Sequence, residues 1–406
     1  MLNVQKIRED FPALNQEIYG HPLVYFDNGA TTHKPQIVID TLLHLYSTQN
    51  SSVHRGMHQL SIQMTEEYEN ARSVVQNFIN AAKREEIIFT GGATGSINTI
   101  ASSFGEVYVS EGDEILITAI EHHSNIVPWQ LLAERKKATI KVIPMNDRGE
   151  LILDGLDVLM TPQTKILALN HVSNALGTIN PVKEIIEKAH ERNIPVLVDG
   201  AQAIQHDKID VQDIDCDFYA FSGHKVYGPN GIGILYGKEE WLEKLPPYQG
   251  GGDMVSSVGF DKTTYAELPL KFEAGTANYP AAIGLGKALD YISSIGKETI
   301  SEYEKTLLEY ATEKMSKIDG LKLYGTSKNK ISTLSFLMEG IHPSDTGLIL
   351  DKMGIAVRSG THCAQPVMTY FGIDGTVRAS MVFYNTKEEI DRLYEGLIKV
   401  KQMFRY

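Results

Sequence analysis

The middle of the chain alternates short apolar segments with amphipathic ones, and this alternation restricts the possible folds more than any other feature. Residues 165–169 (KILAL) and 195–199 (PVLVD) are almost wholly apolar. Between them, Val182 and Ile185 begin an apolar helical face that Asn180 is expected to cap. Strands that are apolar on both sides need helices on both faces of their sheet. The sequence therefore predicts a βαβ series, an α/β fold with a mainly parallel sheet flanked by helices.

The pattern changes near residue 296, where a long amphipathic segment begins and shorter alternating segments follow. A chain of 406 residues also exceeds the size at which one hydrophobic core stops growing. We therefore expect a large ligand-binding domain over residues 26–295 and a smaller α+β domain over residues 296–406. Residues 1–25 are expected to pack with the smaller domain.

The composition excludes several classes of protein. The formal charge is −13 at pH 7, which disfavours a nucleic-acid-binding function. The two cysteines cannot form a disulfide framework and lack metal-ligand spacing, so no metal site is expected. No apolar run is long enough to span a bilayer, and the first residues do not resemble a signal peptide. We expect a cytoplasmic protein that binds neither nucleic acid nor membrane.

Polar side chains gather at the predicted carboxyl ends of the strands, where open parallel sheets bind their ligands. Among them, Asp199 closes one strand and Lys225 follows another. A lysine in apolar surroundings can lose its proton and form a Schiff base. Pyridoxal phosphate (PLP) needs such a lysine, a carboxylate facing its pyridine nitrogen, and a phosphate cradle. Each residue also has an ordinary explanation, Lys225 as a solvated loop lysine and Asp199 as a helix cap.

Two further strand ends carry features that suit the same cofactor. In residues 90–98 (TGGATGSIN), glycines and Thr94 precede a helix, whose free N–H groups attract a phosphate. His122, in the segment EHHSN, can stack on an aromatic ring or make a structural hydrogen bond instead. Three individually weak signals at matching strand ends together indicate a PLP enzyme.

Residues 358–366 (RSGTHCAQP) hold one of the two cysteines in a short loop bounded by glycine and proline. Free cysteine usually acts as a small buried core residue, and Cys216 is interpreted in that way. Cys363 instead lies next to His362 among small residues that allow a ligand to approach. A nucleophilic cysteine reacts as the thiolate, which His362, Arg358 or the cofactor would favour.

Four motifs occur in the same order as in one enzyme family: VDGAQ, FSGHKVYGPNGIGILY, FEAGTAN and RSGTHCAQP. Together with YFDNGATTHKP and SSVHRGMH near the start and VRASMVFYNT near the end, they cover nearly the whole chain. The chain resembles the type II cysteine desulfurases, and most closely their SufS-like branch. These are PLP-dependent transferases of fold type I with class V aminotransferase topology.

The resemblance implies that the chain binds PLP through residues at the strand ends. Lys225 would hold the cofactor as a Schiff base, Asp199 would pair with the pyridine nitrogen, and His122 would stack on the ring. Gln202 would pair with the ring oxygen. Thr276 would reach the phosphate bound by the other subunit, so the resemblance implies a homodimer. The other implied cofactor-binding residues are Thr94, Asn174, Ser222 and His224.

The reaction implied by the resemblance converts L-cysteine to L-alanine. Asn174 and Arg378 would hold the substrate carboxylate, and Lys225, once free, would remove the Cα proton. Cys363 would take the sulfur as a persulfide, and His362 would either shuttle protons or position the loop. The persulfide would pass to an acceptor protein of the SufE or SufU type in iron–sulfur cluster assembly.

The chain departs from the family pattern at two places. Ala93-Thr94-Gly95 replaces the usual Thr-Thr-Glu ahead of the phosphate-binding helix, and Ala277 replaces a proline. The backbone N–H groups are unaffected, so we expect phosphate binding to persist. Neither departure touches Lys225 or Cys363.

Three other functions stay open. A selenocysteine lyase of the same branch, acting on L-selenocysteine, would share every residue named above. A class V aminotransferase or epimerase would keep Lys225 and Asp199 but have no use for Cys363. A catalytically inactive protein with a PLP-enzyme fold would act as an assembly partner.

Overall fold

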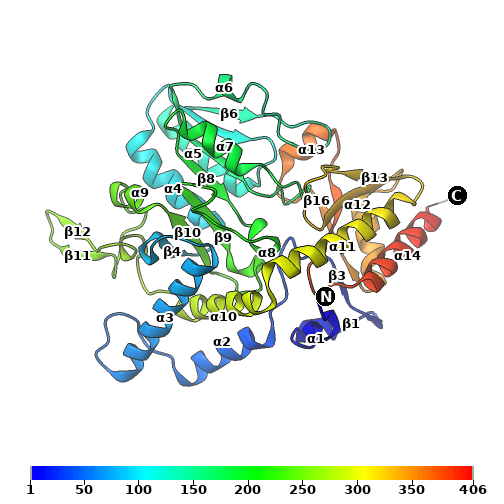
Figure 1. Ribbon diagram of the computed structural model, residues 1–406, viewed down its shortest axis with the longest axis horizontal. Helices are drawn as coiled ribbons and strands as arrows, with labels where there is room; N and C mark the ends of the chain where they lie inside the picture. The colour runs from blue at the N-terminus through cyan, green and yellow to red at the C-terminus, as the bar shows by residue number, and fades with distance from the viewer. Residues whose placement is uncertain (1, 405–406) are drawn as a thin grey trace.

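A computed structural model describes residues 2–404, and a seven-stranded sheet forms its centre (Figure 1). In spatial order its strands are β4 (Ile87–Thr90), β10 (Gly233–Gly237), β9 (Phe218–Ser222), β8 (Val196–Asp199), β7 (Thr164–Asn170), β5 (Glu114–Thr118) and β6 (Thr139–Ile143). Strands β5 to β9 run parallel to one another, whereas β10 runs antiparallel to both of its neighbours. The predicted mainly parallel sheet is confirmed, with one strand reversed.

Helices cover both faces of this sheet because its strands are apolar on both sides. Neighbouring residues of one strand divide between two cores, Ile87 packing into one and Ile88 into the other. The first core is closed by α2 (Gln36–Thr48), α3 (Gln59–Phe78), α7 (Val182–His190), α8 (Ala203–His206) and α10 (Tyr279–Ile295). The second core is closed by α4 (Ala93–Tyr108), α5 (Val127–Lys136) and α9 (Glu239–Lys244).

The predicted cap of α7 is wrong. This helix begins at Val182 directly after Pro181, and no side chain caps it. The Asn180 side chain instead donates from Nδ2 to Asn170, at 2.6 Å from Oδ1 and 2.8 Å from the backbone oxygen. Asn180 therefore supports the carboxyl end of β7 rather than the start of the helix.

The C-terminal part of the chain has a four-stranded sheet and an apolar core of its own. The strands, in spatial order, are β13 (Leu321–Tyr324), β14 (Thr333–Met338), β17 (Thr376–Ser380) and β16 (Arg358–Gly360). The helices that pack on this core are α11 (Lys297–Ser316), α12 (Pro343–Lys352) and α14 (Lys387–Met403). Helix α13 (Gln365–Phe371) joins a small cluster with Ile120 and Leu176, and so bridges the two parts of the chain.

The N-terminal residues contact the C-terminal part. Helix α1 (Val4–Glu9) lies near α14 in Figure 1, and Arg8 pairs with Glu389 at 2.9 Å. Strand β3 (Val24–Tyr25) pairs in parallel with β15 (Ile355–Ala356). These contacts support our proposal that residues 1–25 pack with a small domain that begins after residue 295.

The other elements are β1 (Glu17–Ile18), β2 (His21–Pro22), α6 (Leu156–Leu159) and the projecting hairpin of β11 (Val255–Val258) and β12 (Thr263–Tyr265).

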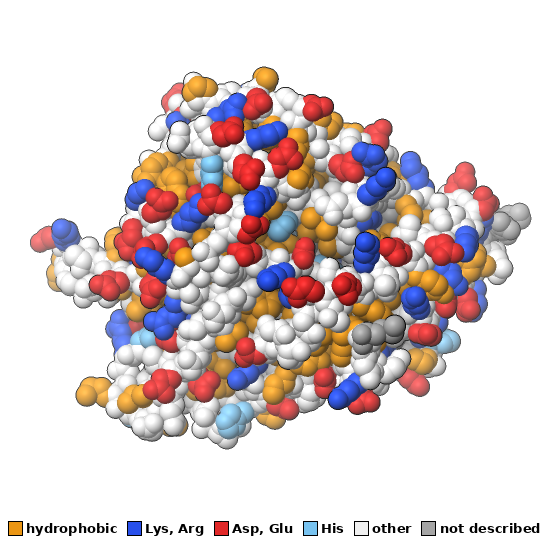
Figure 2. All heavy atoms as spheres, viewed as in Figure 1, with side chains coloured by type: hydrophobic (Ala, Val, Ile, Leu, Met, Phe, Trp, Pro, Cys, Tyr) orange, Lys and Arg blue, Asp and Glu red, His pale blue; other side chains and the backbone are white. Residues whose placement is uncertain are grey.

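The surface carries charges of both signs, interspersed over the face shown in Figure 2. Within residues 2–404, no helix combines the length and apolarity needed to cross a membrane. The same residues contain no group of three or more histidine, cysteine, aspartate or glutamate side chains placed to hold a metal ion.

Candidate active site

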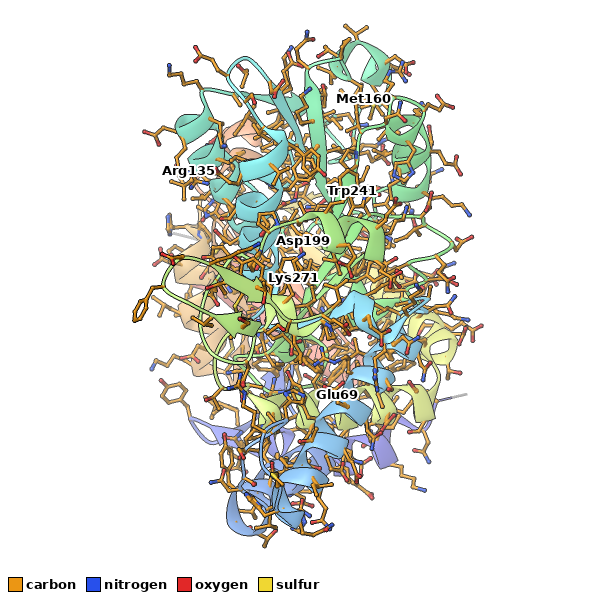
Figure 3. The ribbon with its side chains drawn as sticks, turned by 90° about the vertical axis from the view of Figure 1, so that its left-hand side faces the viewer. Glu69, Arg135, Met160, Asp199, Trp241 and Lys271 are labelled. Atoms are coloured by element: carbon orange, nitrogen blue, oxygen red, sulfur yellow. The ribbon has the colours of Figure 1, made fainter. Side chains whose placement is uncertain are left out.

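A cavity of about 190 Å³ lies where the carboxyl ends of β7, β8 and β9 meet the loop after β16. Asp199, labelled in Figure 3, is buried and forms part of the wall of this cavity. The structure brings nearly all residues predicted for the site to this one cavity: Thr94, His122, Asn174, Asp199, Gln202, Ser222, His224, Lys225, His362, Cys363 and Arg378. Thr276 does not line it.

Lys225 and Asp199 are the two ionisable groups at the ends of neighbouring strands. Burial lowers the pKa of Lys225 to about 8, although Asp199 opposes this shift. Burial raises the pKa of Asp199, and the charge of Lys225 and a hydrogen bond from the Ala201 N–H, at 3.0 Å, act in the opposite direction. A cationic pyridine nitrogen beside Asp199 would stabilise its ionised form. Lys225 is therefore deprotonated far more readily than an ordinary lysine.

The first turn of α4 forms the phosphate-binding end of the cavity. Gly92 precedes this helix with a φ of 138°, a conformation that favours glycine. The Ala93 N–H donates to Ser222 Oγ at 2.8 Å, and the following N–H groups have no partner within the helix. A helix N-terminus of this kind attracts a phosphate dianion. The backbone donors are present even though Ala93 and Gly95 lack the side chains usual in the family.

Buried polar atoms around the cavity that have no protein partner indicate what the cavity binds. Asn174 Oδ1, His362 Nδ1 and Arg378 Nε are buried and unpaired within the described chain. Such atoms are rare in folded proteins and point to a missing ligand or water. His122 is held neutral because burial, reinforced by Lys225, lowers its pKa to about 3. A neutral imidazole, a buried carboxylate, a lysine and a helix N-terminus fit PLP.

The loop that carries Cys363 is held in an uncommon conformation. His362 and Cys363 both have a φ of 55°, in the left-handed region that side-chain-bearing residues seldom adopt. Asn174 donates from Nδ2 to the His362 carbonyl oxygen at 2.5 Å. The His123 N–H donates to the Cys363 carbonyl oxygen at 2.8 Å. Loops of the large sheet therefore hold a loop of the small one.

Arg358, not His362, is the cationic neighbour of the thiol. Arg358 Nη2 lies 4.0 Å from Cys363 Sγ, at the limit of a hydrogen bond to sulfur. His362 Nε2 pairs with Thr376 Oγ1 at 2.8 Å, and burial lowers the pKa of His362 to about 3. A neutral imidazole bonded to Thr376 suits a positioning role better than a proton shuttle.

Two residues that support the site, Asp27 and Gly29, cannot be recognised as such from the sequence around them. Asp27 pairs with Arg378 at 3.1 Å, although 351 residues separate them. A Cβ on Gly29 would lie 2.8 Å from Ser380 Oγ and 3.0 Å from the guanidinium carbon of Arg378, so a larger residue would displace these side chains. The quoted motif YFDNGATTHKP contains both residues, but nothing in it reveals that they meet Arg378.

Thr276 lies outside the active-site cavity of its own chain. It is exposed and lines a second cavity of about 250 Å³. Glu273, three residues earlier, is fixed by Arg72 through bonds of 2.6 and 3.0 Å and by Tyr68 at 2.8 Å. Arg72 also bonds to Glu69, labelled in Figure 3, at 3.0 Å. The segment that contains Thr276 is therefore firmly held at its start.

Comparisons with known proteins agree with this fold and site. The family described as aminotransferase class-V matches residues 24–393. A cysteine desulfurase from Enterobacter sp. is 48% identical over 401 residues, which are 98% of each chain. A cysteine desulfurase from Synechococcus elongatus is 49% identical over 98% of this chain, but the chain spans only 64% of that longer protein.

Solved structures give the same result. The crystal structure of the cysteine desulfurase CsdA (S-sulfonic acid) from Escherichia coli superimposes with a TM-score of 0.92. It is 38% identical, and the superposition covers 99% of both chains. Identity of nearly half the residues along almost the full length of a curated relative shows that the chain belongs to the cysteine desulfurases, the PLP-dependent enzymes of the aminotransferase class-V family.

Proposed function

We propose that this chain releases L-alanine from L-cysteine and captures the sulfur as a persulfide on Cys363. The observation that carries the proposal is that the Cys363 thiol lines the same cavity as Lys225, Asp199 and Arg378. A transamination or epimerisation needs the lysine and the aspartate but no thiol. The position of Cys363 therefore favours desulfuration over the other reactions of this fold.

Each residue in the cavity has a task that its environment suits. PLP, when bound, supplies an electron sink for the pair left when a bond at the substrate Cα breaks. Arg378, whose Nε is unpaired, binds the substrate carboxylate. Lys225, with a pKa of about 8, can take the Cα proton near neutral pH and return it. Asn174 holds the cysteine loop in place through the His362 carbonyl.

Cys363 performs the sulfur transfer. Its thiolate, beside Arg358, attacks the sulfur of the bound cysteine, so that an S–S bond forms as the substrate C–S bond breaks. The electron pair of the C–S bond stays with the carbon fragment, which takes up protons and leaves as alanine. The persulfide then remains on Cys363, inside the cavity.

The proposal extends to the state and partners of the protein in the cell. We place it in the SufS-like branch, as a cytoplasmic homodimer in which Thr276 of each subunit reaches the phosphate of the other. The exposure of Thr276 outside its own cavity supports this arrangement. The hydrogen bonds that hold the cysteine loop support transfer to an acceptor protein of the SufE or SufU type, in iron–sulfur cluster assembly, whose thiol enters the cavity.

Alanine release from L-cysteine, measured with a reductant present, tests the proposal. Cys363→Ala and Lys225→Ala should both abolish release, whereas Cys216→Ala, a change at the buried second cysteine, should retain it. Release that survives in Cys363→Ala would contradict the persulfide step, and a higher rate with L-selenocysteine would then identify a selenocysteine lyase. Light scattering on the purified protein tests the dimer.

A further inference from the structure

A second glutamine lies directly behind the one that lines the active-site cavity. Gln205, on α8, is fully buried, and its Nε2 donates to Gln202 Oε1 at 3.2 Å. Gln202 is also buried, lines the cavity, and donates from its own Nε2 to the Gly29 carbonyl oxygen at 2.7 Å. The two side-chain amides and the Gly29 carbonyl form one hydrogen-bonded chain that ends at the cofactor site.

These contacts determine the orientation of the Gln202 side-chain amide. The Gly29 carbonyl can only accept a hydrogen bond, and the Gln205 amide nitrogen can only donate one. Turning the Gln202 amide by 180° would place oxygen against the Gly29 oxygen and nitrogen against the Gln205 nitrogen. With Gln205 in its present orientation both contacts would then be repulsive, and the Gly29 carbonyl cannot turn into a donor, so the chain of bonds favours one orientation.

We propose that Gln205 is a positioning residue that holds the Gln202 amide with its nitrogen available to the cofactor. A primary amide has two N–H groups, and Gly29 takes one of them, which leaves the second for a ligand. This inference rests on the proposed function and on the role that the family resemblance implies for Gln202, which is to pair with the ring oxygen of PLP. An N–H donor at that oxygen stabilises its ionised form, whereas an amide oxygen would repel it.

Gln205 performs this task at a cost to the fold. Its Oε1 is buried and has no hydrogen-bond partner among the described residues. An unpaired buried oxygen destabilises the folded state, so this amide adds little or nothing to stability. A leucine of similar size at this position would remove the unpaired oxygen together with the contact to Gln202. This substitution is therefore expected to leave thermal stability unchanged or raise it, and to lower the affinity for PLP.

The test compares Gln205→Leu with the unchanged protein in three measurements: thermal unfolding of the cofactor-free form, the dissociation constant for PLP, and a pH titration of the visible absorbance of the PLP-loaded enzyme. The variant should unfold at the same or a higher temperature. Its affinity for PLP should fall by about two- to tenfold, the equivalent of one net hydrogen bond. The midpoint of the titration should move to higher pH because the ionised ring oxygen has lost support.

Two further variants and one control sharpen the result. Gln205→Glu, whose carboxylate only accepts, should move the titration midpoint in the same direction and further. In a Gln202→Leu background, Gln205→Leu should have no additional effect on the midpoint, because it acts only through Gln202. Gln212→Leu changes an exposed glutamine that bonds to the Asn80 carbonyl, and should leave all three measurements unchanged.

An unchanged PLP affinity and titration midpoint in Gln205→Leu, with the unchanged protein active, would overturn this inference alone. A fall in thermal stability that accompanies weaker binding, with the midpoint fixed, would also overturn it and make Gln205 a structural residue. Failure of the unchanged protein to bind PLP or release alanine would overturn the proposed function and this inference together.

Discussion

Arg358 and Arg378 lie directly opposite each other on β16 and β17, and both line the active-site cavity. Like charges at directly opposite positions of neighbouring strands destabilise a sheet. Asp27 pairs with Arg378 at 3.1 Å. Asp27 alone cannot balance the two guanidinium groups, so the arginine pair keeps an excess of positive charge at its end of the cavity. We expect an anionic ligand to relieve this repulsion.

Small amino acids should therefore stabilise the protein through the arginine pair. We expect L-alanine, the product of the proposed reaction, to raise the unfolding free energy by about 2.7 kcal/mol at a concentration one hundred times its dissociation constant. Arg378→Gln should abolish this effect, whereas Arg148→Gln, at an exposed arginine, should preserve it. Thermal unfolding at increasing alanine concentration measures both. Equal stabilisation of the two variants would contradict the assignment of Arg378.

The two cysteines should differ sharply in reactivity. Cys363 faces the cavity beside Arg358, whereas Cys216 is buried, and that burial raises the pKa of its thiol well above the usual range. Iodoacetamide should therefore label Cys363 alone in the folded protein, as judged by mass spectrometry. Arg358→Gln should slow this labelling by about three- to tenfold, because the guanidinium 4.0 Å from Sγ no longer attracts the negative charge of the attacking sulfur. Labelling at an unchanged rate would mean that Arg358 gives the reacting sulfur no electrostatic support.

The stability of the protein should fall in acid, and His362 should contribute. Its pKa is about 3 in the folded protein and 6.5 as the reference for the unfolded chain. Between these values the unfolded chain binds the extra proton, so stability rises with pH. One such group changes the unfolding free energy by about 1.4 kcal/mol per pH unit. Urea unfolding at pH 6, 5 and 4 should show a shallower dependence for His362→Gln, and parallel curves would refute this.

Breaking the buried pair of Arg72 and Glu273 should be strongly destabilising. Arg72 is fully buried and Glu273 nearly so, at 0% and 7% side-chain exposure. Arg72→Met leaves Glu273 buried without its charged partner, which costs about 3–5 kcal/mol. Lys317→Met, in the exposed pair with Glu313, should give no measurable change. Chemical unfolding of both variants checks the contrast, and equal midpoints would mean that Arg72 contributes no more than a surface charge.

Much of the candidate site could be predicted because a mainly parallel sheet brings its strand ends to one edge. Asp199 ends β8, Ser222 ends β9, and Lys225 follows one turn later, so their proximity needs only the positions of the strands. The apolar pattern supplied those positions. It does not specify strand direction, so it does not predict the antiparallel course of β10.

The residues that support the site were not predictable in the same way. Gln205 lies in a short helix beside Ala203 and Ile204, which belong to the core, and nothing local distinguishes it. Asp27 meets Arg378 only through the folding of the whole chain. The left-handed backbone of His362 and Cys363 is held by hydrogen bonds from Asn174 and His123, which are far away in the sequence.

Those same bonds from Asn174 and His123 restrict how sulfur would leave the enzyme under the proposed function. Cys363 belongs covalently to the C-terminal part of the chain, but its loop is anchored to the large sheet. A swinging arm would have to break both of these hydrogen bonds. Under the proposed function the persulfide sulfur would therefore stay in the cavity, and the thiol of an acceptor would have to reach it there.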